Sequence, residues 1–368
     1  MAARAHGAIR RWAVVGLLVA TLLVLPSLVG ALPADVGDAP AAELRTAALA
    51  SADVGFSGYA VSAGGLALPV SDRLTDVADL FSDRTLMRVW WRGPTEHRVD
   101  VVTAAGETDV HRDPAGTWTW DFEAGTATRG VPASLALPTA PDLLPSSLGR
   151  RLLSEAHDDE LSRTGARRIA GREAQGLRLV PSDAASSVGR VDLWLDPASG
   201  LPLQVEVYAE GAEHAALDTR FLDLDLGDPP SRVLAFTPPA EARVLTAPDT
   251  DDLIAQAEQR APLVALPSQL AGLTRRTLDG VPPAVGVYGR GITLLAVAPV
   301  PPRVAGGLDT TLRASPDAVV DAQGVRVAAG PLGLMLVERP GRTAYVLTGT
   351  VSLDALAEAA RRLPGVPT

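Results

Sequence analysis

Cysteine and lysine are both absent from this chain of 368 residues. Without cysteine there is no disulfide, thiol nucleophile, cysteine-based metal site or anchor on an acylated cysteine. Without lysine, all 33 basic residues are arginines, and the abundance of Ala, Gly and Pro is typical of a GC-rich bacterial genome. If the chain is exported, it must fold by packing alone.

Basic charge is also scarce relative to acidic charge. The formal net charge of -10 argues against a nucleic-acid partner held through its phosphates and against broad adhesion to anionic lipid head groups. Hydrophobic residues make up 47% of the chain and charged residues 21%, so it can bury real cores. Its length favours two or three domains, and its 34 Gly and 30 Pro suit a β-rich fold.

Catalytic constellations are missing too. No G-x-S-x-G elbow is present, and the glycine-rich stretch 286–291 (GVYGRG) lacks the Lys-Ser/Thr of a phosphate loop, so we interpret it as a turn between strands. The histidines show no H-E-x-x-H spacing; they are His6, His97, His111, His157 and His214. We therefore expect a protein that is not an enzyme and that binds neither a metal nor a cofactor.

A long apolar segment lies near the N-terminus. Three arginines precede the run from Trp12 to Leu32, and no charged residue follows until Asp35. Roughly twenty residues form a helix of about 30 Å, enough to cross a bilayer, with the N-terminus in the cytoplasm and the bulk of the chain outside. Two interpretations stay open: an uncleaved single-pass anchor in the cell membrane, or a signal peptide cleaved after Val29-Gly30-Ala31 that releases a secreted protein.

The rest of the chain divides by composition. We expect an anchor or signal segment over residues 1–34, a first domain over 38–240, a Pro-rich linker over 241–262 and a small α+β domain over 263–368. In the small domain, three short apolar runs predict strands. A final helix is predicted to begin after Ser352 and to stop at Pro364-Gly365.

The first domain alternates like a half-buried sheet. Apolar residues recur every second position in the stretches 99–101, 193–195 and 203–207, and Trp118 and Trp120 also share a face. A helix with a leucine stripe is predicted over 141–156, and residues 219–236 are expected to hold the last strands. This pattern predicts an antiparallel sheet covered on one side.

Some features allow a functional and a plain structural interpretation. Glu107, Asp109 and His111 would share a strand face and could bind a divalent cation, but a solvated face is favoured, as it is for Asp223 and Asp225. Tryptophans at 90, 91, 118 and 120 could line a ligand cavity or a partner groove, or belong to an ordinary core.

A family becomes recognisable over residues 169–227. The pattern runs Ile169-Ala170-Gly171-Arg172-Glu173-Ala174-Gln175, then Leu193-Trp194-Leu195-Asp196-Pro197, then Gly200-Leu201-Pro202-Leu203. It resembles the RseB/MucB type of sigma-factor regulatory proteins, whose N-terminal domain shares the fold of the LolA and LolB lipoprotein carriers. Phe56-Ser57-Gly58 and Trp118-Thr119-Trp120 look like LolA-like proteins of high-GC Gram-positive bacteria, so the resemblance covers about residues 40–240.

The C-terminal part is more loosely similar to the small second domain of the RseB type, through Tyr288-Gly289-Arg290-Gly291 before an apolar strand. One segment departs from the family. Ala184 to Gly189 stands where those proteins carry a tyrosine-rich segment, so any partner or lipid contacts of that segment do not carry over to this chain.

The resemblance implies an α+β fold in which a curved, unclosed antiparallel half-barrel is covered by helices over an apolar cavity. It implies a membrane-anchored, extracytoplasmic, regulatory binding protein whose ligand is a lipid or an acylated protein, with an anti-sigma-like membrane protein as a further candidate partner. The alternative is a lipid or lipoprotein carrier at the outer face of the cell membrane. The cavity candidates are Val99, Val101, Trp118, Trp120, Leu144, Leu148, Leu193, Leu195, Leu203, Val205 and Val207.

Overall fold

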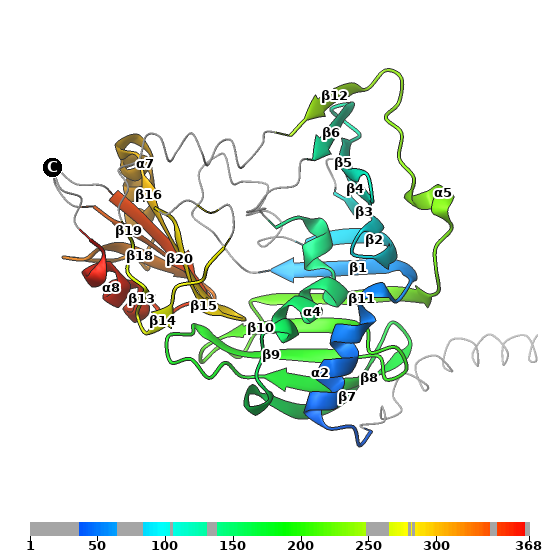
Figure 1. Ribbon diagram of the computed structural model, residues 1–368, viewed down its shortest axis with the longest axis horizontal. Coiled ribbons are helices and arrows are strands. Elements are labelled where there is room, and N and C mark those ends of the chain that lie inside the picture. Colours follow the sequence, from blue (N-terminus) through cyan, green and yellow to red (C-terminus); the bar gives the residue numbers. More distant parts are fainter. Residues whose placement is uncertain are drawn as a thin grey trace, which may run out of the picture.

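The computed structural model describes residues 37–64, 84–103, 106–130, 138–247, 265–278, 281, 284–338 and 344–364. They form two main sheets, each with its own helices, and a short two-stranded sheet (Figure 1). We call residues 37–247 the large-sheet unit and residues 265–364 the small-sheet unit. The predicted N-terminal anchor lies outside the described residues. Within them, no helix has the length and apolar character needed to span a membrane.

The large sheet is unclosed and has twelve strands among the described residues. Neighbouring strands are antiparallel, except that β12 pairs with β6 in parallel. In spatial order they are β12 (Arg243–Thr246), β6 (Thr126–Gly130), β5 (Gly116–Asp121), β4 (Glu107–Asp113), β3 (Glu96–Val102), β2 (Arg84–Gly93), β1 (Phe56–Gly64), β11 (Leu217–Leu226), β10 (Pro202–Ala209), β9 (Val188–Leu195), β8 (Arg172–Leu179) and β7 (Leu161–Ile169).

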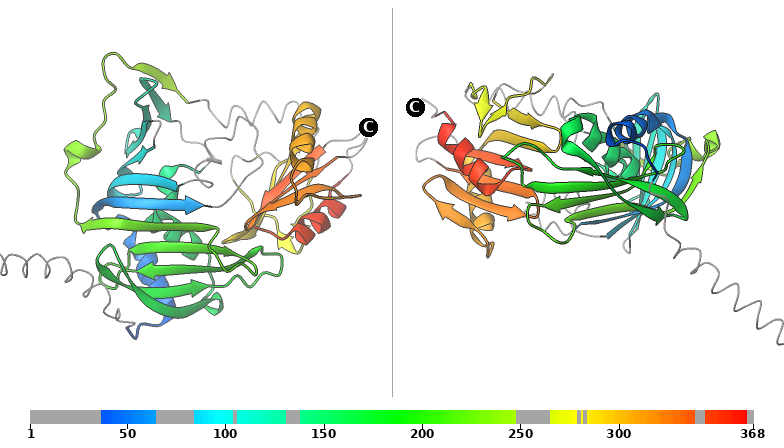
Figure 2. Two further views of the ribbon diagram at one scale, coloured as in Figure 1. Left: turned by 180° about the vertical axis from the view of Figure 1, so that it is seen from behind. Right: turned by 90° about the horizontal axis from the view of Figure 1, so that it is seen from below.

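Two helices cover one face of this sheet. Helix α2 (Ala41–Ala50) and helix α4 (Pro145–Ser154) lie together over strands β7 to β11, and Figure 2 shows both on the same side of the curved sheet. The short 3-10 helices are η1 (Ser51–Asp53), η2 (Ala140–Leu143) and η3 (Asp158–Glu160). We call the covered face the inner face and the opposite one the outer face.

Local sequence explains why α4 can lie so close to the sheet. Pro145 occupies its first turn, where a missing N–H costs nothing. A Cβ atom at Gly149 would lie 2.7 Å from the Cβ of Pro202 on β10, which is closer than carbon atoms can approach. Only glycine at position 149 therefore allows this helix to contact β10 directly.

The tight turn between β9 and β10 is also encoded locally. Asp196 Oδ1 accepts hydrogen bonds from the backbone N–H groups of Ala198 and Ser199, at 3.0 and 2.9 Å. Gly200 has a φ of +71°, a conformation that glycine adopts without strain. The turn thus joins β9 and β10 into an antiparallel hairpin.

The small sheet carries a helix on each face. Its strand order is β15 (Gly286–Arg290), β16 (Thr293–Val300), β20 (Ala344–Gly349), β19 (Leu332–Val337), β18 (Gly324–Ala329) and β17 (Val319–Asp321). Met335 and Leu347 belong to the core beneath helix α8 (Leu353–Arg362), whereas Leu336 belongs to the core beneath helix α7 (Pro302–Arg313). A short hairpin of β13 (Gln269–Leu270) and β14 (Leu273–Thr274) belongs to this unit and adds Leu270 and Leu273 to the core beneath α8.

Two sequence predictions are wrong here. Residues 219–236 do not hold several strands: β11 ends at Leu226, and the chain continues into the single helical turn α5 (Ser231–Leu234). The GVYGRG stretch is not mainly a turn, because Gly286 to Arg290 forms strand β15 with Tyr288 fully buried.

Candidate functional site

Five of the predicted cavity residues lie side by side on the inner face. Val205 of β10 pairs with Leu193 of β9, and Val207 pairs with the neighbouring Val191. Together with Leu195 and Leu203, they are buried. Leu44 and Ala48 of α2 and Leu152 and Leu153 of α4 belong to the core that contains Leu193 and Val205. The helices therefore fill this face, and an acyl chain could enter between sheet and helices only if the helices moved.

The two predicted residues on the covering segment lie in different environments. Leu144, which immediately precedes α4, is fully buried in a core with Phe56 and Trp91. Leu148, one turn later, is only partly buried and packs against the core over β8 to β11. Leu148 is thus the candidate on α4 that a ligand could reach with the least rearrangement.

The remaining four candidates do not share a face. Val99 of β3 pairs with Val89 and Val110, and with the partly buried Val101 it packs into the inner core. Trp118 pairs instead with His111, which in turn pairs with Arg98, the residue preceding Val99. Trp118 and Trp120 therefore lie on the outer face, and the prediction that they line one cavity with Val99 is wrong.

An aromatic cluster covers the outer face at this point. The ring of Phe236 stacks on His111 at 4.6 Å between centroids and lies 6.0 Å from Trp118 and 6.3 Å from Trp120. His111 Nδ1 lies 3.2 Å from the carbonyl oxygen of Leu234. The chain after β11 thus crosses back over β4 and β5. The sequence did not lead us to predict that Phe236 covers the outer face, although an aromatic residue within a Pro-rich stretch was a signal.

The other two tryptophans are divided in the same way. Trp91 is buried on the inner face between Phe56 and His97, with ring centroids at 6.0 and 4.5 Å. Trp90 lies on the outer face, where the Arg98 guanidinium is 5.1 Å from its ring centroid. Trp91 is therefore a core residue, and Trp90 takes part in an outer charged cluster.

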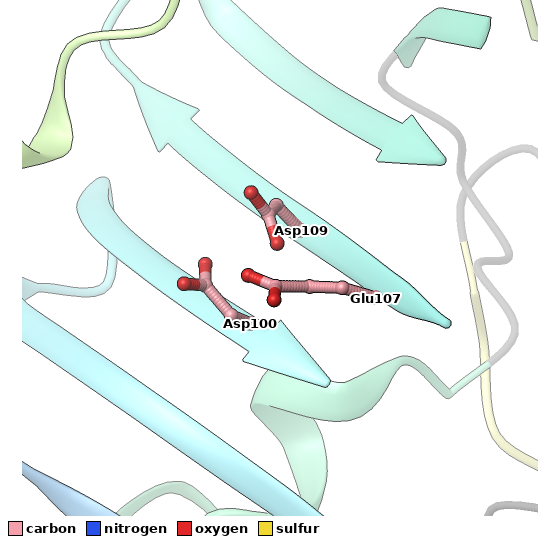
Figure 3. Close-up of side chains that lie close together, drawn as sticks. All are labelled: Asp100, Glu107 and Asp109. Carbon is pink, nitrogen blue, oxygen red and sulfur yellow. The ribbon is translucent and has the colours of Figure 1, made fainter. Parts of the chain in front are cut away.

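That cluster gathers three carboxylates on β3 and β4. Asp100, Glu107 and Asp109 bring oxygen atoms within 4.8 Å of one another (Figure 3). Arg98 donates to Asp100 at 2.6 and 2.9 Å and to Asp109 at 3.0 Å, and Arg88 donates to Glu107 at 2.5 Å. Two guanidinium groups thus hold the position that a cation would take, and the residues fit an internal ion-pair network better than a metal site.

Burial sets the electrostatics of this network. Burial raises the pKa of Asp100 above its usual value, against the opposing effect of Arg98. Burial acts in the same direction on Asp109, but hydrogen bonding to His111 and the charge of Arg98 outweigh it and lower the pKa of Asp109. Asp109 is 6% exposed and His111 4%, so the interpretation of a solvated strand face is wrong for both. It is confirmed for Asp223 and Asp225, which are exposed.

Comparison with known proteins agrees with this architecture. Residues 130–241 match the family model of the MucB/RseB N-terminal domain, and no curated protein matches the chain. A crystal structure of MucB in complex with the periplasmic part of MucA has 19% sequence identity and a TM-score of 0.50, and covers 89% of this chain and 100% of that chain. The Pseudomonas aeruginosa MucA/MucB complex has 20% identity and a TM-score of 0.51, with 89% and 99% covered.

A LolA superfamily protein from Nitrosomonas europaea, at 13% identity and a TM-score of 0.26, covers 54% of this chain and 99% of that chain. The matched segment 130–241 contains both the hairpin of β9 and β10 and the helix α4 that covers it. The large unclosed sheet, its covering helices and the separate small sheet are those of the MucB fold. Residues 130–241 therefore resemble the N-terminal domain of the MucB/RseB family, and the chain has the MucB fold.

Proposed function

We propose that this protein is an extracytoplasmic regulatory protein that binds the outer segment of an anti-sigma-like membrane protein. One observation carries this proposal: two structures of MucB in complex with MucA each match 89% of the chain. The match includes the small-sheet unit as well as the large one. The proposed regulation works by binding: the protein needs a surface that contacts its partner, and it does not need to catalyse a reaction.

A lipid or acylated protein is the second proposed ligand. The support is the apolar layer between the inner face and the helices, which is continuous from Val205 and Leu193 to Leu152. Ligand sites of this class are mostly apolar with few polar groups. Since α2 and α4 close the layer, we propose that lipid entry accompanies a displacement of these helices.

Attachment to the cell membrane is proposed from the sequence of residues 12–32 alone. Three preceding arginines and the following acidic residues favour a cytoplasmic N-terminus. An uncleaved segment would keep the binding units at the outer surface of the membrane, within reach of a membrane partner. A cleaved segment would release them.

The test uses the full-length protein in its own membranes. Chemical crosslinking followed by purification should recover a membrane protein with an extracytoplasmic segment, and native mass spectrometry of gently extracted protein should show its mass. A bound lipid mass without a protein partner would favour the carrier function instead. Failure to recover any partner after crosslinking would count against the regulatory proposal, and the measured mass of the mature chain decides whether residues 12–32 are retained.

A further inference from the structure

The segment that departs from the RseB pattern contacts the small sheet. Ser186, just before β9, forms an antiparallel β-bridge with Val351, which follows β20. The backbone N–H of Ser187 donates to the carbonyl of Thr350 at 3.2 Å, and the N–H of Ser352 donates to the carbonyl of Ala185 at 2.9 Å. Residues 185–187 thus extend the large-sheet unit into direct backbone pairing with the small-sheet unit.

Each unit also inserts an apolar side chain into the other. Ala185 of the large-sheet unit is buried in the core of the small-sheet unit, among residues such as Val351 and Leu356. In return, Ile292 of the small-sheet unit packs against the core of the large-sheet unit that includes Leu152 and Leu179. This exchange couples the two cores without a shared strand.

Two carboxylates at the end of α4 and in η3 receive arginines from the small-sheet unit. Arg276 donates to both oxygens of Glu155 at 2.9 and 2.7 Å, and the N–H of Gly291 donates to Glu155 at 2.7 Å. Arg290 donates to both oxygens of Glu160 at 3.0 and 2.7 Å. Bidentate pairs of this kind fix orientation as well as distance.

We propose that these contacts form an interdomain clasp that holds the two units in one orientation, so that a partner meets them as a single rigid body. Two units joined by one chain move relative to each other unless their interface is strong. Here backbone pairing, exchanged apolar residues and two bidentate ion pairs act together. The clasp also gives the segment that replaces the tyrosine-rich region a function of its own.

The chemistry of Glu160 makes the clasp resistant to acid. Burial opposes its ionisation, but the Arg290 guanidinium, the N–H groups of His157 and Ser182 and the Ser182 hydroxyl lower the pKa of Glu160 far below its usual value. The Glu160–Arg290 pair is therefore retained at pH values well below those at which an ordinary glutamate becomes protonated.

The absence of cysteine makes the test direct, because two labels can be placed without background. Spin labels at Ala115→Cys and Ala314→Cys, exposed in the large-sheet and small-sheet units, report the distance between the units by pulsed electron resonance. We expect a single narrow distance distribution in the otherwise unchanged full chain. The triple variant Arg276→Gln, Arg290→Gln, Ile292→Ser should lose that narrow peak and give a broad distribution.

A matched control removes the same kinds of side chain elsewhere in the small-sheet unit. Arg313 and Arg362 form ion pairs within their own helices, and Val304 is exposed, so Arg313→Gln, Arg362→Gln, Val304→Ser should keep the narrow peak. Circular dichroism checks that each variant is folded; if the triple variant is not, the double variant Arg276→Gln, Arg290→Gln takes its place. A broad distribution in the unchanged chain, or a narrow one in the folded clasp variant, would overturn the proposal.

Discussion

The hydroxyl of Thr219 donates a hydrogen bond of 2.6 Å to the carbonyl oxygen of Leu143. Thr219 lies on β11 and is completely buried, and Leu143 ends η2 two residues before the first residue of helix α4. Because the carbonyl groups at the end of a short helix lack partners within it, this bond satisfies a buried acceptor. It also fixes the start of the covering helix to the inner face of the sheet.

Thr219→Val should therefore loosen the cover of the inner face. The substitution keeps the shape but leaves the Leu143 carbonyl buried and unpaired, which costs about 1–3 kcal/mol. Urea denaturation should show this loss in the free energy of unfolding. Thr46→Val is the control, because the Thr46 hydroxyl bonds to the Ala42 carbonyl on the exposed side of α2; an equal effect of both variants would contradict the special role of Thr219.

Arg98 should be the residue on which the outer charged cluster depends. Its guanidinium contacts both Asp100, whose side chain is completely buried, and Asp109. Arg98→Met would leave the buried Asp100 carboxylate without its hydrogen-bonded partner and with only Arg88, at 3.8 Å, as a nearby cation, which costs up to roughly 3 kcal/mol. Calorimetry should show a clear fall in Tm for this variant. The exposed Arg112, on the adjacent strand, is the comparison: Arg112→Met should change Tm little.

His97 should make the protein less stable in mild acid. Its ring is buried against Trp91, and burial, aided by the charge of Arg112, lowers the pKa of His97 from 6.5 to about 4. Well above pH 6.5 the imidazole is neutral in both the folded and the unfolded state and contributes no pH dependence. As the pH falls from 6.5 towards 4, the unfolded chain takes up a proton that the folded chain does not, so stability is lost, by roughly 2 kcal/mol near pH 5.

Replacing His97 should flatten this part of the stability profile. We expect the free energy of unfolding of His97→Gln, measured by urea titration across the same pH window, to change less than that of the unchanged protein. His214, which is exposed, provides the control variant His214→Gln with the original slope. A slope retained in His97→Gln would assign the acid sensitivity to other groups.

Local patterns predicted the elements of this fold because they depend on near neighbours. The alternation around Val205 and the Asp196 turn together specify a hairpin, and both are found. The leucine stripe predicted helix α4, and Ser352 predicted the start of helix α8. Each of these signals is complete within about ten residues of sequence.

The faces could not be predicted in the same way. Trp118 and Val99 lie on different strands, and which of their faces coincide depends on the register set by the pairing of Arg98 with His111. The outer face is apolar here because Phe236 reaches it from more than one hundred residues further along the chain. When both faces of a strand carry large buried side chains, the sequence does not show which of the two faces packs against the helices.

The predicted N-cap of the final helix, α8, is confirmed, and substitution of Ser352 can measure its contribution to stability. The hydroxyl of Ser352 accepts a hydrogen bond from the N–H of Ala355 at 3.2 Å and caps α8. Ser352→Ala should lower the free energy of unfolding by about 1 kcal/mol, whereas Ser352→Asp should retain the cap. Urea midpoints of the two variants measure the difference. A loss in both would show that the backbone bond of Ser352 to Ala185, rather than the cap, is disturbed.

Lipid retention should depend on Leu148, and substitution of Leu148 is a better test of lipid binding than substitution of Val205. Val205 is completely buried within the core, so Val205→Arg would place a charge there and unfold the protein whether or not lipid binds. Leu148 is partly buried on α4, and Leu148→Gln should leave the fold intact while weakening an acyl chain held beneath the helix. Native mass spectrometry of membrane-extracted protein measures the bound lipid, with the exposed Arg151→Gln on the same helix as control. If Leu148→Gln retains as much lipid as Arg151→Gln, the lipid does not bind between α4 and the sheet.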